Sequence, residues 1–208
     1  MEILKIKKLK FPEVKLIRFA RFRDQRGYFT ETYQKRDFAQ AGIDLPDKLK
    51  FVQVNESFSK KGTIRGLHFQ WNPYMGKLVR TISGQMVDLV LDIRKNSPHF
   101  GQIIAQEMFS DFGKDEDQWI WLPPGFGHGN FFLTDTAIEY YCTGGYNPQG
   151  EVGISPLAKD IDWSLCDKEL QEKFKEIISG NFFISEKDSQ GLTVSQWQKD
   201  PRANNFIY

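Results

Sequence analysis

Alternating apolar and polar positions predict short strands along most of the chain, and the clearest covers residues 86–93. One face of this strand is entirely apolar and should pack against a core: Val87, Leu89, Leu91 and Ile93. The opposite face combines two apolar residues with the carboxylates of Asp88 and Asp92. A mixed face of this kind suits the lining of a cavity.

Further strands are predicted over residues 77–82, 119–122 and 137–143, where apolar, β-branched and aromatic residues concentrate. Turn-forming residues separate the predicted strands: Ser83-Gly84, Asn96-Ser97-Pro98, Pro123-Pro124-Gly125, Gly144-Gly145 and Asn147-Pro148. Many short strands at this spacing predict an all-β sandwich or barrel.

Helices are few, and we predict two. A short one covers residues 35–41 and ends at Gly42. A longer one covers residues 167–179, where Asp167 can cap the start and Gly180 can end the helix. Its apolar stripe should pack on the core and consists of Leu170, Phe174, Ile177 and Ile178.

The composition favours one globular domain over residues 1–208, because a chain with 40% hydrophobic residues and no repeat or linker can bury a sizeable core. Lysine and arginine number 28 against 27 acidic residues, a net charge of +1. This balance gives no electrostatic case for a nucleic acid polymer or an anionic membrane, although local basic side chains could hold a small phosphorylated ligand. No apolar run approaches the length of a membrane span, and residues 1–10 lack a signal-peptide core, so we expect a cytoplasmic protein.

Two of the three histidines lie in segments that also contain glycine, residues 65–70 and 122–129. Histidine is a natural general base near neutral pH, and glycine lets a backbone approach a ligand closely. Each histidine could equally be structural, and each glycine an ordinary turn. Nucleophilic hydrolysis and dinucleotide or ATP binding find no support, because the GxSxG, GxGxxG and P-loop patterns are missing. Cys142 and Cys166 lack a CxxC spacing and are expected to be reduced structural residues.

Six segments occur in an order that points to one family: residues 22–31, 51–55, 65–70, 76–80, 92–101 and 121–129. Together they resemble the dTDP-4-dehydrorhamnose 3,5-epimerase family, with a match over roughly residues 10–163 and over 184–188. The resemblance implies a cupin-type jelly roll (double-stranded β-helix) with a few short peripheral helices. It also implies a nucleotide-sugar substrate, no cofactor, and a homodimer with shared active sites. Residues 164–183 are expected to form a helical insertion.

The sequence argues against a bound metal. Metal-binding cupins supply a His-x-His strand motif with a further carboxylate and histidine, whereas His68 is followed by Phe69 and Gln70. His68 and His128 alone would leave a metal short of ligands. We therefore expect neither a metal nor a cofactor.

The resemblance assigns catalytic roles to four residues. Such a substrate carries a ketone at sugar carbon 4, which acidifies the hydrogens on carbons 3 and 5. His68 matches the base that removes a proton, and Asp188 matches its carboxylate partner. Lys77 matches the group that stabilises the enolate oxygen, and Tyr140 matches the acid that returns a proton to the opposite face.

The tyrosine assignment has a close competitor. The spacing from His128 to the tyrosine segment is one residue shorter than the family pattern, so both Tyr140 and Tyr141 fit. Strand alternation places the two on opposite faces. Tyr140 is preferred, because residues 140–143 then match the family's pattern best.

The resemblance also implies a set of substrate-binding residues: Arg26, Phe29, Glu31, Gln53, Asn55, Arg65, His128, Tyr146 and Glu151. Arg65 and His128 match positions near the phosphates and the catalytic base. The segment with Arg26, Phe29 and Glu31 matches one that reaches the partner subunit's nucleotide. Phe29 could instead be plain core, and Arg26 and Glu31 could form a surface ion pair of little value.

Two residues depart from the family pattern, and one further feature fits it only if a strand is irregular. Asn130 stands where the family usually has Phe, and His99 stands in a predicted loop where the family usually has Thr. His99 is expected to have no role. Simple alternation puts Arg65 and His68 on opposite faces of a strand, so a bulge at Gly66 is needed to bring them together.

The leading prediction is 3,5-epimerisation of a dTDP-4-keto-6-deoxyhexose through an enolate, on the path to dTDP-L-rhamnose or a related deoxysugar. The alternatives nearest to it are epimerisation at a single carbon and use of a GDP- or CDP-linked sugar. A cupin ketoisomerase would move the ketone rather than invert a centre. A non-catalytic sugar-binding cupin would not need His68, Lys77 and Tyr140 together.

Overall fold

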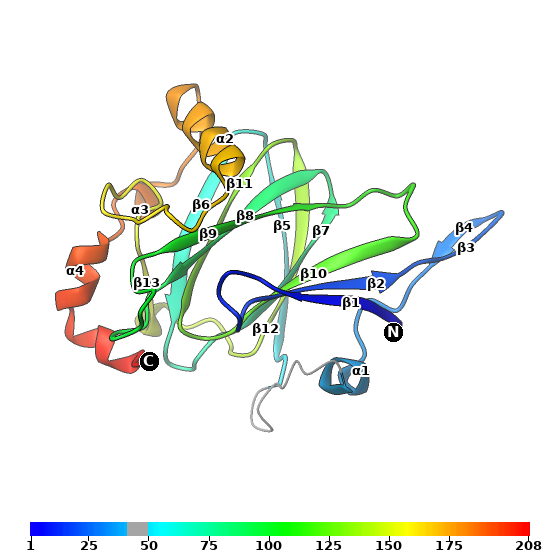
Figure 1. Cartoon of the computed structure of the whole chain (residues 1–208), viewed down its shortest axis with the longest axis horizontal. Coiled ribbons are helices and arrows are strands. Elements are labelled where there is room, and N and C mark those ends of the chain that lie inside the picture. Colours follow the sequence, from blue (N-terminus) through cyan, green and yellow to red (C-terminus); the bar gives the residue numbers. More distant parts are fainter. Residues whose placement is uncertain (41–49) are drawn as a thin grey trace.

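The computed structural model describes residues 1–40 and 50–208, and its strands form two antiparallel sheets that face each other (Figure 1). The larger sheet has the strand order β1-β2-β10-β7-β12-β5. Its strands are β1 (Ile3–Lys8), β2 (Lys15–Ala20), β10 (Glu116–Leu122), β7 (Lys77–Ser83), β12 (Thr136–Cys142) and β5 (Gln53–Ser59). The predicted strands at residues 77–82, 119–122 and 137–143 are therefore confirmed to within a few residues.

The smaller sheet has the order β13-β6-β11-β8-β9. Its strands are β13 (Glu151–Gly153), β6 (Ile64–Gln70), β11 (Phe126–Phe132), β8 (Gln85–Asp92) and β9 (Ile103–Phe109). A separate hairpin, β3 (Phe22–Asp24) and β4 (Gly27–Phe29), projects away from both sheets (Figure 1). The predicted all-β sandwich or barrel is confirmed.

Short helices lie at the periphery: α1 (Lys35–Gln40), α2 (Lys168–Ser179), α3 (Glu186–Ser189) and α4 (Val194–Lys199), with 3-10 turns at Pro148–Gly150 and Pro201–Asn205. The predicted boundary of the first helix at Ala41 and Gly42 falls outside the described residues.

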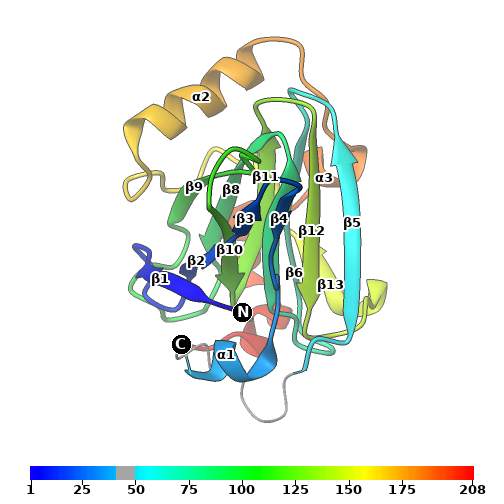
Figure 2. The same ribbon diagram turned by 90° about the vertical axis from the view of Figure 1, so that its right-hand side faces the viewer.

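The long helix α2 begins and ends close to where the sequence predicted, and it lies across one face of the molecule (Figure 2). Asp167 occupies the cap position, but its side chain makes no capping hydrogen bond. Leu170 and Phe174 are buried and Ile177 packs against the same core. Ile178 is 37% exposed, so its assignment to the apolar stripe was wrong. It lies at the rim of the stripe, outside the cluster that Ile177 joins.

Two apolar clusters bury the faces of the smaller sheet. The cluster between the sheets includes Val79, Met86, Val90, Ile120 and Phe132. The cluster on the outer face of the smaller sheet, under α2 and α4, includes Val87, Leu89, Leu91 and Ile93, as the sequence predicted. Strand β8 is therefore buried on both faces.

The two carboxylates of β8 have different surroundings. Asp88 faces His128 beside the cavity described below. Asp92 instead accepts hydrogen bonds from the Arg94 side chain at 2.7 Å and from the Ser97 hydroxyl at 2.7 Å. The expectation that both carboxylates would belong to a cavity face was thus wrong for Asp92, which fixes the turn that follows β8.

A bulge in β6 brings Arg65 and His68 to the same face, as their proposed roles required. Opposite β11, His68 pairs with His128 and Arg65 pairs with Asn130, so three steps on β6 match two on β11. Gly66 has a φ of +97°, and a Cβ there would lie 2.5 Å from the Cα of Gly129. Only glycine fits this position, because the two strands approach too closely for any side chain.

None of the described helices is long and apolar enough to cross a membrane.

Candidate active site

A cavity of about 310 Å³ lies between the two sheets. Most of the residues assigned to the site from the sequence line it: Gln53, Asn55, Arg65, His68, Lys77, His128, Tyr140, Tyr146, Glu151 and Asp188. They come from strands of both sheets and from the loops before β13 and at α3. Segments more than 100 residues apart are thereby brought into one polar space, because the chain alternates between the two facing sheets along most of its length.

His68 and Asp188 form a close pair. The Nε2 atom of His68 lies 2.7 Å from a carboxylate oxygen of Asp188, and the other oxygen accepts a hydrogen bond from the backbone N–H of Gly66 at 3.3 Å. Burial raises the pKa of Asp188, but the hydrogen bonds from His68, the Gly66 backbone and Ser185 outweigh it, so that the pKa is lowered. Asp188 is therefore ionised at neutral pH.

The ionised carboxylate fixes the tautomer of His68. A carboxylate only accepts hydrogen bonds, so Nε2 must carry the proton that is shared with Asp188. The lone pair is then left on Nδ1, which lies 3.9 Å from an oxygen of Glu151. The second oxygen of Glu151 is held by Lys187 at 2.5 Å. Nδ1 of His68 is thus the atom free to take a proton from a bound molecule.

Lys77 begins β7 and points into the same cavity. Among the described residues its ammonium group has no carboxylate within 4.0 Å, and its electrostatic neighbours are Cys142, Glu151 and Asp88. Burial lowers its pKa from the ordinary lysine value. A desolvated ammonium group without a fixed partner is suited to bind an oxygen that becomes negative during a reaction.

The two candidate tyrosines lie on opposite faces of β12, as strand alternation requires. Tyr140 lines the cavity, and burial raises the pKa of its phenol. Tyr141 lies on the other face of β12 among aromatic rings, with ring-centroid distances of 5.3 Å to Trp119 and 5.6 Å to Tyr33. Of the two, only Tyr140 can therefore contact a molecule in the cavity.

His128 and Asp88 form a second histidine–carboxylate pair, 3.0 Å apart. Both are buried, and burial lowers the pKa of His128 even though Asp88 acts to raise it. The Oδ1 atom of Asp88 has no hydrogen-bond partner among the described residues. This pair lies at the side of the cavity nearer the core.

Polar side chains at the mouth of the cavity are oriented by one another. Gln53 donates to Asn55 at 3.0 Å and accepts from the backbone of Tyr146 at 2.9 Å. Arg65 is held by the Ser59 hydroxyl at 2.9 Å. These side chains leave further donors and acceptors available to a polar ligand.

Three residues predicted for the site lie elsewhere in this chain. Arg26, Phe29 and Glu31 belong to the β3–β4 hairpin and the segment after it, and Phe29 is 65% exposed, so Phe29 is not a core residue. The alternative of an Arg26–Glu31 ion pair is also wrong. Arg26 binds Asp24 at 2.5 Å, and Glu31 binds the N-terminal amine at 2.7 Å.

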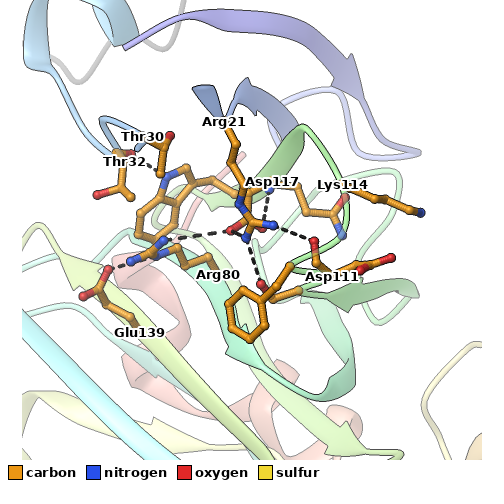
Figure 3. Close-up of polar contacts among 12 residues, drawn as sticks. Arg21, Thr30, Thr32, Arg80, Asp111, Lys114, Asp117 and Glu139 are labelled. Carbon is orange, nitrogen blue, oxygen red and sulfur yellow. Dashed lines mark hydrogen bonds and ion pairs between the residues drawn. The ribbon is translucent and has the colours of Figure 1, made fainter. Parts of the chain in front are cut away.

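The base of the hairpin is fixed by a chain of charges on the outer face of the larger sheet (Figure 3). Arg21 binds Asp117 at 2.5 Å, and Arg80 links Asp117 to Glu139, at 4.0 Å and 3.0 Å. The Arg21 guanidinium also lies 4.5 Å from the ring centre of Tyr28 in the hairpin. The hairpin is therefore anchored at its base, while its tip stays exposed.

Several lining residues were missed from the sequence: Ser57, Met75, Asn130, Ile138, Cys142 and Lys187. Lys187 lies inside the matched segment 184–188, so its neighbour Asp188 was a usable signal. Asn130 and Cys142 follow from strand alternation with His128 and Tyr140. His99, in contrast, lies outside the cavity and bonds Gln102 at 2.7 Å.

Within residues 1–40 and 50–208, no cluster of three or more His, Cys, Asp or Glu side chains is arranged to hold a metal ion. Cys142 and Cys166 are both free and buried.

Two facing sheets that enclose a histidine pair, a lysine and a tyrosine define a cupin-like protein equipped for acid–base chemistry. The family model for dTDP-4-dehydrorhamnose 3,5-epimerase matches residues 8–196, and the chain belongs to this family of isomerases. A curated dTDP-4-dehydrorhamnose 3,5-epimerase from Shigella flexneri is 35% identical over 184 residues, which cover 85% of this chain and 98% of the relative.

Solved structures agree with the fold. The structure of dTDP-6-deoxy-D-glucose-3,5-epimerase from Legionella pneumophila, in complex with dTDP-4-keto-L-rhamnose, has a TM-score of 0.78 and 30% identity, covering 98% of this chain and 97% of that one. A 3'-monoepimerase from Streptomyces bikiniensis, in complex with dTDP-quinovose, has a TM-score of 0.67 and 25% identity, covering 94% and 88%. The predicted cupin-type jelly roll is confirmed, with sheet edges that remain open.

Proposed function

We propose that this protein inverts carbons 3 and 5 of a dTDP-4-keto-6-deoxyhexose, and that His68 and Tyr140 act from opposite sides of the sugar. The observation that carries the proposal is their placement: His68 stands on β6 of one sheet and Tyr140 on β12 of the facing sheet, with one cavity between them. Inversion needs proton loss on one face and proton gain on the other, so a base and an acid on opposite walls suit it.

The proposed reaction balances without a cofactor. Nδ1 of His68 takes the proton from a carbon next to the ketone, and the carbon–hydrogen electron pair moves to give an enolate with its charge on the carbon-4 oxygen. Lys77 stabilises that charge, an effect typically of about 3 kcal/mol. Tyr140 then gives its proton to the opposite face of the carbon and restores the ketone. A proton returns from His68 to Tyr140 through solvent, and the cycle repeats at the second carbon.

Asp188 supports the base in this scheme. Its negative charge stabilises the imidazolium that forms when His68 takes the proton, and its hydrogen bond keeps the ring in one orientation. Lys187 holds Glu151 beside the same ring.

The proposed binding of the nucleotide involves two subunits. Arg65 and His128 would contact the diphosphate within one chain, while the exposed β3–β4 hairpin would carry Arg26 and Phe29 to the site of a second copy. The proposal is supported by the hairpin's anchored base and its exposed tip.

Mixing Arg26→Ala chains with His68→Ala chains should restore some activity through heterodimers with one intact site. Heterodimers without activity would contradict a shared site.

The function is tested by incubating the enzyme with dTDP-4-keto-6-deoxyglucose in heavy water and following each carbon by nuclear magnetic resonance. Deuterium should appear at carbons 3 and 5 with inversion at both. Exchange at one carbon would indicate a single-centre epimerase, and a displaced ketone would indicate a ketoisomerase. Binding without exchange would refute catalysis. GDP- and CDP-linked substrates are compared in the same assay, and chelator-treated enzyme should keep its turnover.

A further inference from the structure

Two polar residues, His128 and Asn130, interrupt an apolar stripe on β11. Alternate residues of this strand face the space between the sheets, and Phe126 and Phe132 belong to the core there. Between them, His128 and Asn130 line the cavity. The alternation of the strand therefore directs the Asn130 side chain at a bound molecule rather than at bulk solvent.

The Asn130 amide has no partner within the part of the chain that the structure describes. The residue is 3% exposed, and its side chain forms no hydrogen bond with residues 1–40 or 50–208. Its amide atoms are not among the fully sealed polar atoms of the described chain, so their remaining access is to the cavity. A polar group in such a confined position gains from a fixed hydrogen-bond partner. Since the amide borders the cavity, a ligand can supply the missing bond.

The neighbours of Asn130 indicate which part of the ligand this is. Across the sheet, Asn130 pairs with Arg65 on one side and with Asp88 on the other. The row of His68 and His128 is the next one along the strands. Asn130 thus lies between Arg65, which is proposed for the diphosphate, and the row that holds His68, which is proposed for the reacting end of the sugar.

We propose that the Asn130 amide hydrogen-bonds the hydroxyl at carbon 2 of the sugar, and so determines whether 2-deoxy sugars are accepted equally well. Carbon 2 adjoins carbon 1, which carries the diphosphate, so its hydroxyl lies between the two groups that flank Asn130. The inference rests on the proposed function. It is particular to this chain, because the phenylalanine usual in the family pattern cannot form such a bond.

The test compares dTDP-4-keto-6-deoxyglucose with its 2-deoxy congener in the Asn130→Leu variant, which keeps the volume and removes the amide. For the 2-hydroxy substrate, kcat/KM should fall on the order of 10- to 100-fold, and for the 2-deoxy congener by less than about threefold. The affinity for dTDP alone should stay unchanged. Gln106→Leu is the matched control, because Gln106 is the next residue in the same row, beyond Asp88, and does not line this cavity.

Equal losses for both substrates would overturn the proposal and assign Asn130 a structural role beside Asp88. A matching loss of dTDP affinity would also overturn it, by assigning the amide to the diphosphate. If Asn130→Leu does not fold, Asn130→Ala is measured with the same pair. If the wild-type protein turns over neither substrate, the proposed function fails. The affinity ratio for dTDP-rhamnose and its 2-deoxy congener then still tests Asn130.

Discussion

The histidines of the two histidine–carboxylate pairs lie opposite each other on neighbouring strands, yet the surroundings of the two pairs differ. His68 is partly exposed to the cavity, and both oxygens of its partner Asp188 accept hydrogen bonds. His128 is buried, and one oxygen of its partner Asp88 has no partner among the described residues. The same pair of residue types therefore occurs once with a partly exposed histidine and a carboxylate bonded through both oxygens, and once with a buried histidine and a carboxylate that leaves one oxygen unpartnered.

This difference teaches which pair can move a proton repeatedly. A base must reach the substrate and afterwards exchange its proton with solvent, which His68 can do. Burial lowers the pKa of His128, so that it resists protonation and is better suited to donate or accept a fixed hydrogen bond. Sequence pattern alone treats the two histidines alike, whereas exposure and hydrogen bonding separate them.

The largest effect is expected from removing the base. His68→Asn should abolish both deuterium exchange and product formation, with a loss on the order of 1,000-fold or more. His128→Asn should keep exchange measurable and mainly weaken substrate binding. The measurement is nuclear magnetic resonance of the substrate carbons in heavy water. Exchange that survives in His68→Asn but disappears in His128→Asn would reverse the assignment of the two pairs.

The next effect separates the acid from the base. Tyr140→Phe leaves His68 and Lys77 in place, so a substrate carbon should still exchange deuterium by return of the proton on its original face. Inverted product should fall on the order of 100-fold. Tyr141→Phe removes a hydroxyl from the aromatic cluster and is the matched control, with little expected change. The opposite result for the two variants would show that the tyrosines had been assigned one residue out of register.

Much of the fold was predictable because strand alternation is a local signal. The strand at residues 86–93 and the helix at residues 167–179 came within one or two residues of β8 and α2. Ile178 was misassigned because helical periodicity gives the direction of a side chain but not the edge of the surface it meets. Asp92 was misassigned because period-2 alternation cannot tell a cavity wall from a turn that uses the same carboxylate.

The site was predictable only with the resemblance. His68 and Asp188 are 120 residues apart in the chain, and no local pattern joins them. The bulge at Gly66 was predicted only because Arg65 and His68 had to face the same site. Its physical reason is visible in the structure, where Gly129 approaches too closely for a side chain at position 66. Lys187 and Asn130 could have been found, because Lys187 adjoins Asp188 and Asn130 alternates with His128, but neither had a role in the family pattern to draw attention to it.

A smaller effect is expected from the two carboxylates themselves. Asp188→Asn removes the charge that stabilises protonated His68, and kcat should fall about 10- to 100-fold with little change in KM. Asp88→Asn removes a carboxylate whose second oxygen is unpartnered, and kcat should change by less than about threefold. Steady-state kinetics measure both. Equal losses of kcat in the two variants would contradict the distinction between the pairs.

The smallest effect at neutral pH concerns Lys77, and it appears only as the pH rises. Burial lowers the pKa of Lys77 and raises that of Tyr140, so the loss of the ammonium proton moves toward neutral pH and the loss of the phenol proton moves away from it. Lys77 must be charged to stabilise the enolate. Activity should therefore fall about tenfold per pH unit once the pH exceeds the lowered pKa of Lys77. The exchange reaction of Tyr140→Phe should show this same alkaline decline, because the lysine is still present. A decline that vanishes in Tyr140→Phe would instead belong to the phenol, and the enolate would need another stabilising group.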